Sequence, residues 1–235
     1  MIQRDTVKRL LKDVKDIIKN PLTDNGIYYV HDEEDMLKGY ALIIGPQDTP
    51  YFGGYYFFNI KYPQDYPFSL PTVKYCTNAN NVRFHPNLYS DGKVCISILN
   101  TWKGEQWSSC QNISSILLSL FTLFKKNPLL LEPGVKKTNV DVNTYNKIIE
   151  YANIDIAFCD ILNKKTGVYL PFFNLFETIM RENFIKNIEK IDEFVNNQNK
   201  NIEELRLQYY YNRMNIIIDY KSVINKLHHL KTIYN

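Results

Sequence analysis

The sequence contains the run Arg83-Phe84-His85-Pro86-Asn87-Leu88-Tyr89-Ser90-Asp91-Gly92-Lys93-Val94-Cys95, followed directly by Ile96-Ser97-Ile98-Leu99. Seven residues separate Asn87 from Cys95. A free cysteine is most often a small buried apolar residue. Its thiolate can also act as a nucleophile where its surroundings activate it. The segments on either side of this run therefore decide between a structural and a chemical role for Cys95.

Upstream of this run the pattern is one helix and then strands. Residues 4–19 predict an amphipathic helix, because apolar residues recur there at helical spacing: Val7, Leu10, Leu11, Val14, Ile17 and Ile18. Lysines occupy its opposite face, at 8, 12, 15 and 19. Strand candidates follow at 26–31, 36–44, 55–61 and 72–76. Their short connections predict an antiparallel meander.

Downstream the pattern becomes a long functional loop over 80–110 and then helices at 112–125 and 141–163. After residue 163 it is helical: a long segment from Leu170 to about Val195, an Asn-rich loop at 196–201, and a last helix at about 220–234. Apolar residues keep a three-to-four spacing along the long segment: Phe173, Phe176, Ile179, Met180, Phe184, Ile188, Ile191 and Phe194. We expect this stripe to pack on the preceding domain.

Three motifs stand in one order along the chain. Tyr62-Pro63-Gln64-Asp65-Tyr66-Pro67-Phe68-Ser69-Leu70-Pro71 comes first, the run ending at Cys95 second, and Trp107-Ser108 before Ile113–Leu120 third. Together they resemble the ubiquitin-conjugating (E2) enzymes, over about residues 4–153. The resemblance implies an α+β UBC (E2) fold, with an N-terminal helix, a four-stranded antiparallel meander, an active-site loop and C-terminal helices. We expect a catalytic core at 1–163 and an all-α C-terminal extension at 164–235, packed on the core.

Three further segments are similar to the E2 Z class of that family. They are the insertion Thr101-Trp102-Lys103-Gly104, the run Asn127–Gly134, and the span from Tyr145-Asn146-Lys147 through Ala157-Phe158-Cys159-Asp160. This likeness covers nearly the whole chain and is weakest after about residue 195.

By the resemblance, Cys95 accepts the C-terminal glycine of the modifier as a thioester. No charged base adjoins it, so we expect activation by the partner E1 enzyme and by solvent exposure. Asn87 either donates to the developing oxyanion or braces the loop. His85 is interpreted as a loop-shaping residue and not as a base, and Pro86 as a residue that rigidifies the same turn. Cys76, Cys110 and Cys159 are interpreted as structural, in apolar or helical surroundings.

The resemblance also suggests residues for the later steps. Glu132 is the candidate for orienting the incoming lysine; the alternatives are an ordinary solvent-facing Glu and a contact surface of exposed leucines at 129–131. Phe68, Ser108 and Ser109 are candidates for contacting E3 ligases, although the family's usual proline is replaced by Ser109. The lysine face of the first helix is either a partner surface or an ordinary solvated face.

Composition excludes several other classes of protein. A net charge of +3 and no basic stripe argue against a nucleic-acid binder. The four cysteines lie far apart and lack metal-ligand spacing, so we expect no zinc site. The resemblance to E2 enzymes implies no metal and no organic cofactor, with ATP used by the E1. The first residues lack an apolar signal region, and no apolar run reaches the ~18 residues of a membrane span. We expect a cytoplasmic protein, with the nucleus as an alternative.

The expected function is therefore that of an E2 enzyme. Its partners would be an E1 activating enzyme, ubiquitin or a ubiquitin-like modifier, E3 ligases and protein substrates. One rival is a catalytically silent E2-like scaffold, but such variants usually lack the cysteine. Another is a papain-like protease, but those enzymes place the cysteine far before the histidine, and here the order is reversed.

Overall fold

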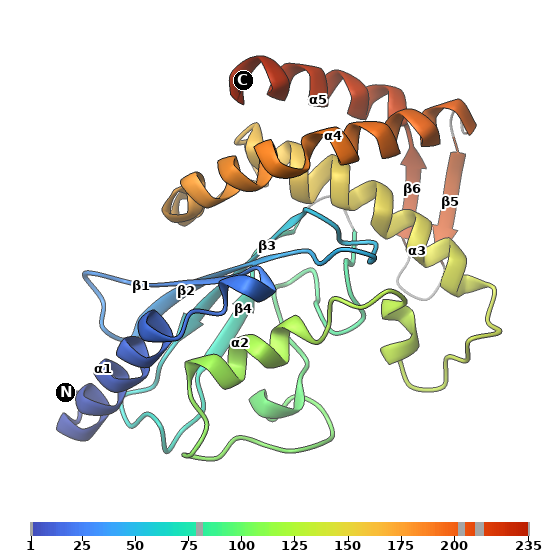
Figure 1. The fold of residues 1–235 in the computed structure, drawn as a ribbon. Helices are drawn as coiled ribbons and strands as arrows, with labels where there is room; N and C mark the ends of the chain where they lie inside the picture. Colours follow the sequence, from blue (N-terminus) through green and yellow to red (C-terminus); the bar gives the residue numbers. More distant parts are fainter. Residues whose placement is uncertain (1, 79–81, 202–204, 210–213, 235) are drawn as a thin grey trace. The chain divides into compact units, whose positions relative to one another are not determined.

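The computed structural model describes residues 2–78, 82–201, 205–209 and 214–234 (Figure 1). The chain forms two compact units, and neither is continuous in sequence. The first unit comprises Met1–Ile43, Tyr56–Cys76 and Asn87–Phe124. The second comprises Ile44–Tyr55, Thr77–Pro86 and Lys125–Asn235. This division does not follow the boundary expected at residue 163, which stays a prediction.

The first unit is built around a sheet of four strands in the order β1-β2-β3-β4. The strands are β1 (Ile27–His31), β2 (Lys38–Ile44), β3 (Tyr55–Lys61) and β4 (Thr72–Tyr75). β1 pairs antiparallel with β2, placing Ile27 opposite Ile43, and β3 pairs antiparallel with β4, placing Phe58 opposite Tyr75. The helical elements of this unit are α1 (Arg4–Lys19), η1 (Thr23–Asn25), η2 (Ser97–Leu99) and α2 (Ile113–Phe121). The expected N-terminal helix and four-stranded antiparallel meander are confirmed, whereas residues 80 and 81 of the expected loop at 80–110 lie outside the described residues.

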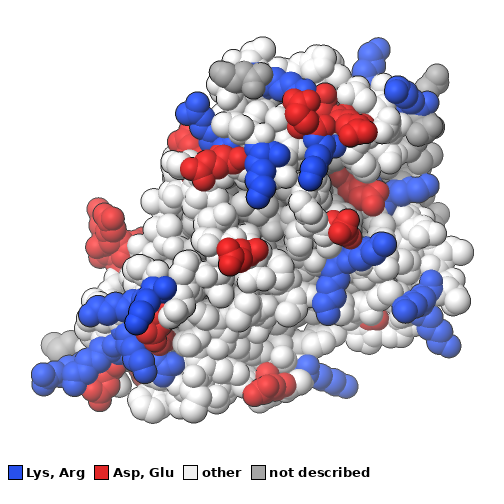
Figure 2. All heavy atoms as spheres, viewed as in Figure 1, with Lys and Arg blue, Asp and Glu red and all other residues white. Residues whose placement is uncertain are grey.

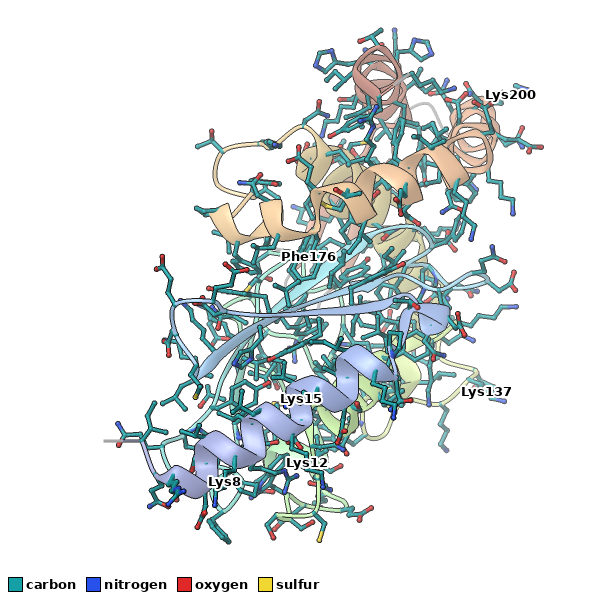
Figure 3. The ribbon with its side chains drawn as sticks, turned by 60° about the vertical axis from the view of Figure 1, so that its left-hand side comes forward. Lys8, Lys12, Lys15, Lys137, Phe176 and Lys200 are labelled. Carbon is teal, nitrogen blue, oxygen red and sulfur yellow. The ribbon has the colours of Figure 1, made fainter. Side chains whose placement is uncertain are left out.

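Helix α1 buries only part of its apolar stripe. Leu10 and Ile17 are buried, whereas Leu11 and Ile18 are exposed. The lysines lie on the outside: Lys8, Lys12 and Lys15 project from α1 in Figure 3, and Figure 2 shows Lys and Arg side chains gathered over this helix. The second helix, α2, begins with a capping box, in which the Ser115 amide donates to the Asn112 side chain over 3.0 Å.

The second unit is mainly helical. Its elements are η3 (Pro128–Leu131), α3 (Asp141–Ala152), the π-helix η4 (Asn153–Asp160), η5 (Pro171–Phe176), α4 (Glu177–Asn201), β5 (Leu205–Tyr209), β6 (Met214–Ile218) and α5 (Tyr220–Tyr234). The helical extension is confirmed, with two corrections. The Asn-rich segment 196–201 is the end of α4 and not a loop, and the extension is not all-α because β5 and β6 form an antiparallel hairpin (Figure 1).

Aromatic side chains join the helices of the second unit. Phe184 of α4 is fully buried, with its ring stacked on Phe158 of η4 at 5.8 Å and tilted against Tyr234 of α5 at 5.1 Å. Most of the predicted apolar stripe is buried, including Phe176, which Figure 3 labels. Ile179 and Phe194 are half-buried. The stripe therefore docks α4 within this unit.

A buried charge cluster also fastens α5. The Lys226 ammonium lies 2.5 Å from a carboxylate oxygen of Asp155 and 2.6 Å from one of Asp160. The Asp160 side chain is only 2% exposed and also pairs with Lys165 at 2.7 Å. Burial acts to lower the pKa of Lys226, but the two aspartates raise it on balance. Lys226 is therefore held in its charged form.

Candidate active site

A tight turn carries the run from Asn87 to Cys95 and belongs to the first unit. Leu88 and Val94 form an antiparallel bridge, and the Gly92 amide donates to the Tyr89 carbonyl over 3.0 Å. Strand β4 supports the turn, because the Tyr75 amide donates to the Gly92 carbonyl over 2.8 Å. Gly92 has a φ of +92°, and a Cβ there would come within 2.9 Å of the Tyr75 carbonyl oxygen. Glycine is required at this position for both reasons.

Two hydrogen bonds join Asn87 to Cys95. The Cys95 amide donates to the Asn87 carbonyl over 2.9 Å, and the Asn87 side-chain amide donates to the Cys95 carbonyl over 2.6 Å. Asn87 is itself buried. Its side chain therefore braces the backbone that carries the cysteine, which is one of the two roles expected for it.

Cys95 is buried. Only 4% of the residue is exposed, so the expectation that it is solvent-exposed is wrong for this structure. The Thr101 hydroxyl bonds the backbone on both sides of Cys95. It donates to the Val94 carbonyl (2.9 Å) and accepts from the Ile96 amide (3.0 Å). The inserted segment 101–104 folds back toward Ser97. Its Gly104 lies so close that a Cβ added there would be 3.0 Å from the Ser97 side chain.

The first half of the motif, His85-Pro86, belongs to the second unit and is fixed there. The Tyr51 hydroxyl donates to the Phe84 carbonyl and the Tyr145 hydroxyl of α3 donates to the Arg83 carbonyl, each over 2.7 Å. The Arg83 guanidinium donates to the Pro86 carbonyl. These three contacts hold the backbone from residue 83 to residue 86 in place.

His85 is fully buried in this segment. Burial, with added repulsion from Arg83 and Lys125, lowers the pKa of His85 to about 3. Its imidazole is therefore neutral at neutral pH. A neutral buried ring fits the loop-shaping role, which stays a prediction.

The other three cysteines differ in their surroundings. Cys76 and Cys159 are buried, and burial raises the pKa of the Cys76 thiol to about 11 and that of Cys159 well above its ordinary value. Both therefore remain protonated thiols at neutral pH, as structural cysteines do. Cys110 is exposed in the loop before α2, so its expected apolar or helical setting is wrong.

Glu132 follows η3 in the second unit and is half-buried. Its backbone amide donates to the Leu129 carbonyl over 3.1 Å. The alternative of an exposed leucine surface is wrong here, because Leu129 is fully buried and Leu130 and Leu131 are half-buried.

The candidates for ligase contact lie in two loops of the first unit. Phe68 is 73% exposed, and Ser108 and Ser109 are exposed as well. The two loops are joined by the Trp107 indole, which donates to the Pro67 carbonyl over 2.8 Å. An exposed ring of this size beside exposed serines is available for contact with another protein.

Helix α1 supports both of these loops. The Arg9 guanidinium donates to the Ser109 carbonyl over 2.7 Å and to the Asp13 carboxylate over 2.9 Å. The same carboxylate accepts from the Tyr66 hydroxyl at 2.5 Å. The positions of Phe68 and Ser109 therefore depend on Asp13, the buried acid in α1.

The structure brings together part of the predicted site. Cys95 and Asn87 meet in the first unit, which also contains Phe68, Ser108 and Ser109, whereas His85, Pro86 and Glu132 belong to the second. The residues whose hydroxyls bond the backbone of the motif were not predicted. They are Tyr51 and Tyr145, which bond residues 84 and 83, and Thr101, which bonds residues 94 and 96. Only Thr101 gave a signal, as a hydroxyl residue shortly after the cysteine that could bond nearby backbone.

The described ranges lack the features of two other kinds of site. No three histidine, cysteine, aspartate or glutamate side chains gather there as metal ligands would. None of the helices drawn in Figure 1 combines the length and the apolar character needed to cross a membrane.

Comparison with known proteins gives the family. The sequence profile of the ubiquitin-conjugating enzymes matches residues 9–152. Ubiquitin-conjugating enzyme E2 Z of Xenopus tropicalis is 38% identical over 192 residues, which are 76% of this chain and 61% of that protein. The Homo sapiens E2 Z is 43% identical over 172 residues, 72% of this chain and 48% of that protein. The probable ubiquitin-conjugating enzyme protein 17 of Caenorhabditis elegans is 37% identical over 201 residues, 79% of this chain and 27% of that protein. The chain thus spans about half to three fifths of the E2 Z relatives.

Proposed function

Because the chain belongs to the ubiquitin-conjugating enzyme family, we propose that it carries ubiquitin or a ubiquitin-like modifier as a thioester on Cys95. The matched segment contains Cys95 and Asn87, and the two hydrogen bonds between these residues are the observation that supports the proposal most. The turn holds one cysteine in a fixed backbone geometry, as a nucleophile needs.

The first step exchanges one thioester for another. The Cys95 thiolate attacks the carbonyl of the modifier's C-terminal glycine on the E1 enzyme, and the E1 sulfur leaves as a thiolate. One carbon–sulfur bond forms and one breaks, so the step needs no oxidant or reductant. ATP is consumed earlier, by the E1, and we propose that this chain uses no metal or organic cofactor of its own.

The second step moves the modifier to a lysine amine or to an E3 cysteine. A lysine nitrogen forms the new amide bond, Cys95 leaves as a thiolate, and the amine loses a proton. We propose Glu132 as the group that orients the incoming lysine. Asn87 acts here through the backbone of the turn. Its side-chain amide donates to the Cys95 carbonyl and so supports the turn during both steps.

Partners and compartment follow from the same proposal. Phe68, Ser108 and Ser109 form the E3-contact surface, with Arg9 and Asp13 fixing its two loops. We place the reaction in the cytoplasm, with the nucleus as an alternative. The extension at 164–235 packs on the core residues of the second unit; the hydrogen bond from the Tyr55 hydroxyl to the Met180 carbonyl, over 2.9 Å within that unit, supports this proposal.

A charging assay on the full chain tests the proposal. Incubation with E1, ATP and ubiquitin should give an adduct on a non-reducing gel that dithiothreitol removes. Cys95→Ala should abolish the adduct, and Cys110→Ser, which changes the exposed cysteine of the same unit, should keep it. A protein that charges equally well as Cys95→Ala, or that never charges with any E1 and modifier pair, would reject the assignment.

A further inference from the structure

A cavity of about 200 Å³ lies wholly within the second unit. Three elements form its walls: the turn at residues 48–52, the junction between α3 and η4, and the second half of α4. Neither the thioester chemistry nor the ligase loops of the first unit use it. Its lining therefore calls for an explanation of its own.

The lining combines apolar walls with negative charge. Phe52, Ile154, Ile191 and Phe194 supply aromatic and aliphatic surface, and Asp48 and Glu150 are the ionisable lining residues. No lysine, arginine or histidine is among the described residues that line the cavity. An apolar cavity with carboxylates and no cation is complementary to a ligand that has an apolar body and a positive end.

Among the described lining residues there is no cation to pair with Glu150. Burial raises its pKa, an effect that Lys147 partly offsets. A carboxylate in this position gains more from an incoming cation than a fully solvated one does.

The cavity is already formed in the free chain. The Asn153 side-chain amide donates to the Phe52 carbonyl over 2.9 Å, which ties the turn to the end of α3. The Asn183 amide of α4 donates to the Gly53 carbonyl over 3.1 Å, which ties the same turn to α4. Because all three walls are fixed to one another, a ligand would not have to order them on binding.

We propose that this cavity binds an arginine side chain of a partner polypeptide. Pockets for drug-sized molecules are about 300–1,000 Å³, so a cavity of 200 Å³ suits a single side chain better. A guanidinium stacks on aromatic rings such as Phe52 and Phe194, pairs with carboxylates in fixed geometry, and is less strongly hydrated than an ammonium. The methylene stem would pack against Ile154 and Ile191.

Binding of short peptides to the isotope-labelled full chain tests the proposal by amide NMR shifts. The probes are acetyl-Leu-Arg-Leu-amide, its lysine analogue, and its citrulline analogue, which keeps the shape of arginine without the charge. The arginine peptide should give saturable shifts confined to residues 48–52, 150–154 and 191–194. Citrulline should weaken binding about tenfold, the cost of losing one charge-assisted contact, and lysine should bind more weakly than arginine.

Variants of the chain test whether the carboxylates of the cavity bind the arginine peptide. Glu150→Gln should weaken the arginine peptide about tenfold, while Glu182→Gln, the same change at an exposed site on α4, should not. If Glu150→Gln fails to fold, Asp48→Asn provides the test, because asparagine tolerates the positive φ of 58° found there. Equal binding of arginine and citrulline, lysine binding as tightly as arginine, shifts outside these residues, or no effect of either variant would overturn the proposal.

Discussion

Replacing Phe184 with alanine tests whether the C-terminal helices are an integral part of the fold. Its side chain is fully buried and contacts the rings of Phe158 and Tyr234, at 5.8 and 5.1 Å. Removing a buried phenylalanine costs about 3–5 kcal/mol, which includes the cavity left behind. Since domains are stable by roughly 5–15 kcal/mol, the variant should lose about a fifth or more of its free energy of unfolding.

Urea unfolding followed by circular dichroism measures this loss. The matched control is Ile185→Ala, at the next position of the same helix, where the side chain is 56% exposed. A substitution at such a surface site should change the free energy of unfolding by about 0.5 kcal/mol or less. If the two variants unfold within about 1 kcal/mol of each other, α4 is not held by the packing described above.

Three further predictions concern the site loop, its histidine and the charge cluster. Asn87→Ala should lower the free energy of unfolding by about 1–3 kcal/mol, because the Cys95 carbonyl loses its buried donor. The same loss should slow both charging of Cys95 and discharge of the modifier. Slow discharge with normal charging would instead favour the oxyanion role of Asn87. The folded pKa of His85, about 3, lies below the unfolded value, so stability should be full above about pH 6.5 and fall as the pH drops toward 3. His85→Gln should flatten that fall in urea titrations at pH 7 and 4.5, and an unchanged pH dependence would contradict the assigned shift. Lys226→Met should lower the free energy of unfolding by up to about 3 kcal/mol, because Asp155 loses its cation and the buried Asp160 keeps only Lys165, whereas the exposed Lys221→Met should cost little. Equal melting of the two variants would refute the role of this charge cluster in fastening α5.

The sequence predicted most of the fold where local pattern and burial agree. The heptad-like stripe of α1 and the four short strands gave their positions to within about two residues, because side-chain periodicity reports directly which face is buried. The Asn-rich end of α4 was missed since asparagine is a poor helix former. The helix continues there with local support, as when the Asn196 side chain bonds the Asp192 carbonyl four residues earlier.

The β-hairpin and the burial of Cys95 could not be predicted from side-chain periodicity. A short run such as Met214–Ile218 does not distinguish a strand from a buried helix by periodicity alone. Cys95 and Asn87 could be named from their motif, but the burial of Cys95 could not. The Thr101 hydroxyl bonds the backbone on either side of Cys95, and no sequence period encodes such contacts.

The central claim is that Cys95 carries the modifier as a thioester, and Cys95→Ser tests it most directly. The serine oxygen is a poorer leaving group than sulfur, so the full chain with E1, ATP and ubiquitin should accumulate a one-ubiquitin adduct. Intact-mass measurement should find this adduct stable to dithiothreitol and cleaved by hydroxide, while transfer to lysine stops. An adduct that dithiothreitol still removes from the Cys95→Ser protein would place the thioester on another cysteine and contradict the account.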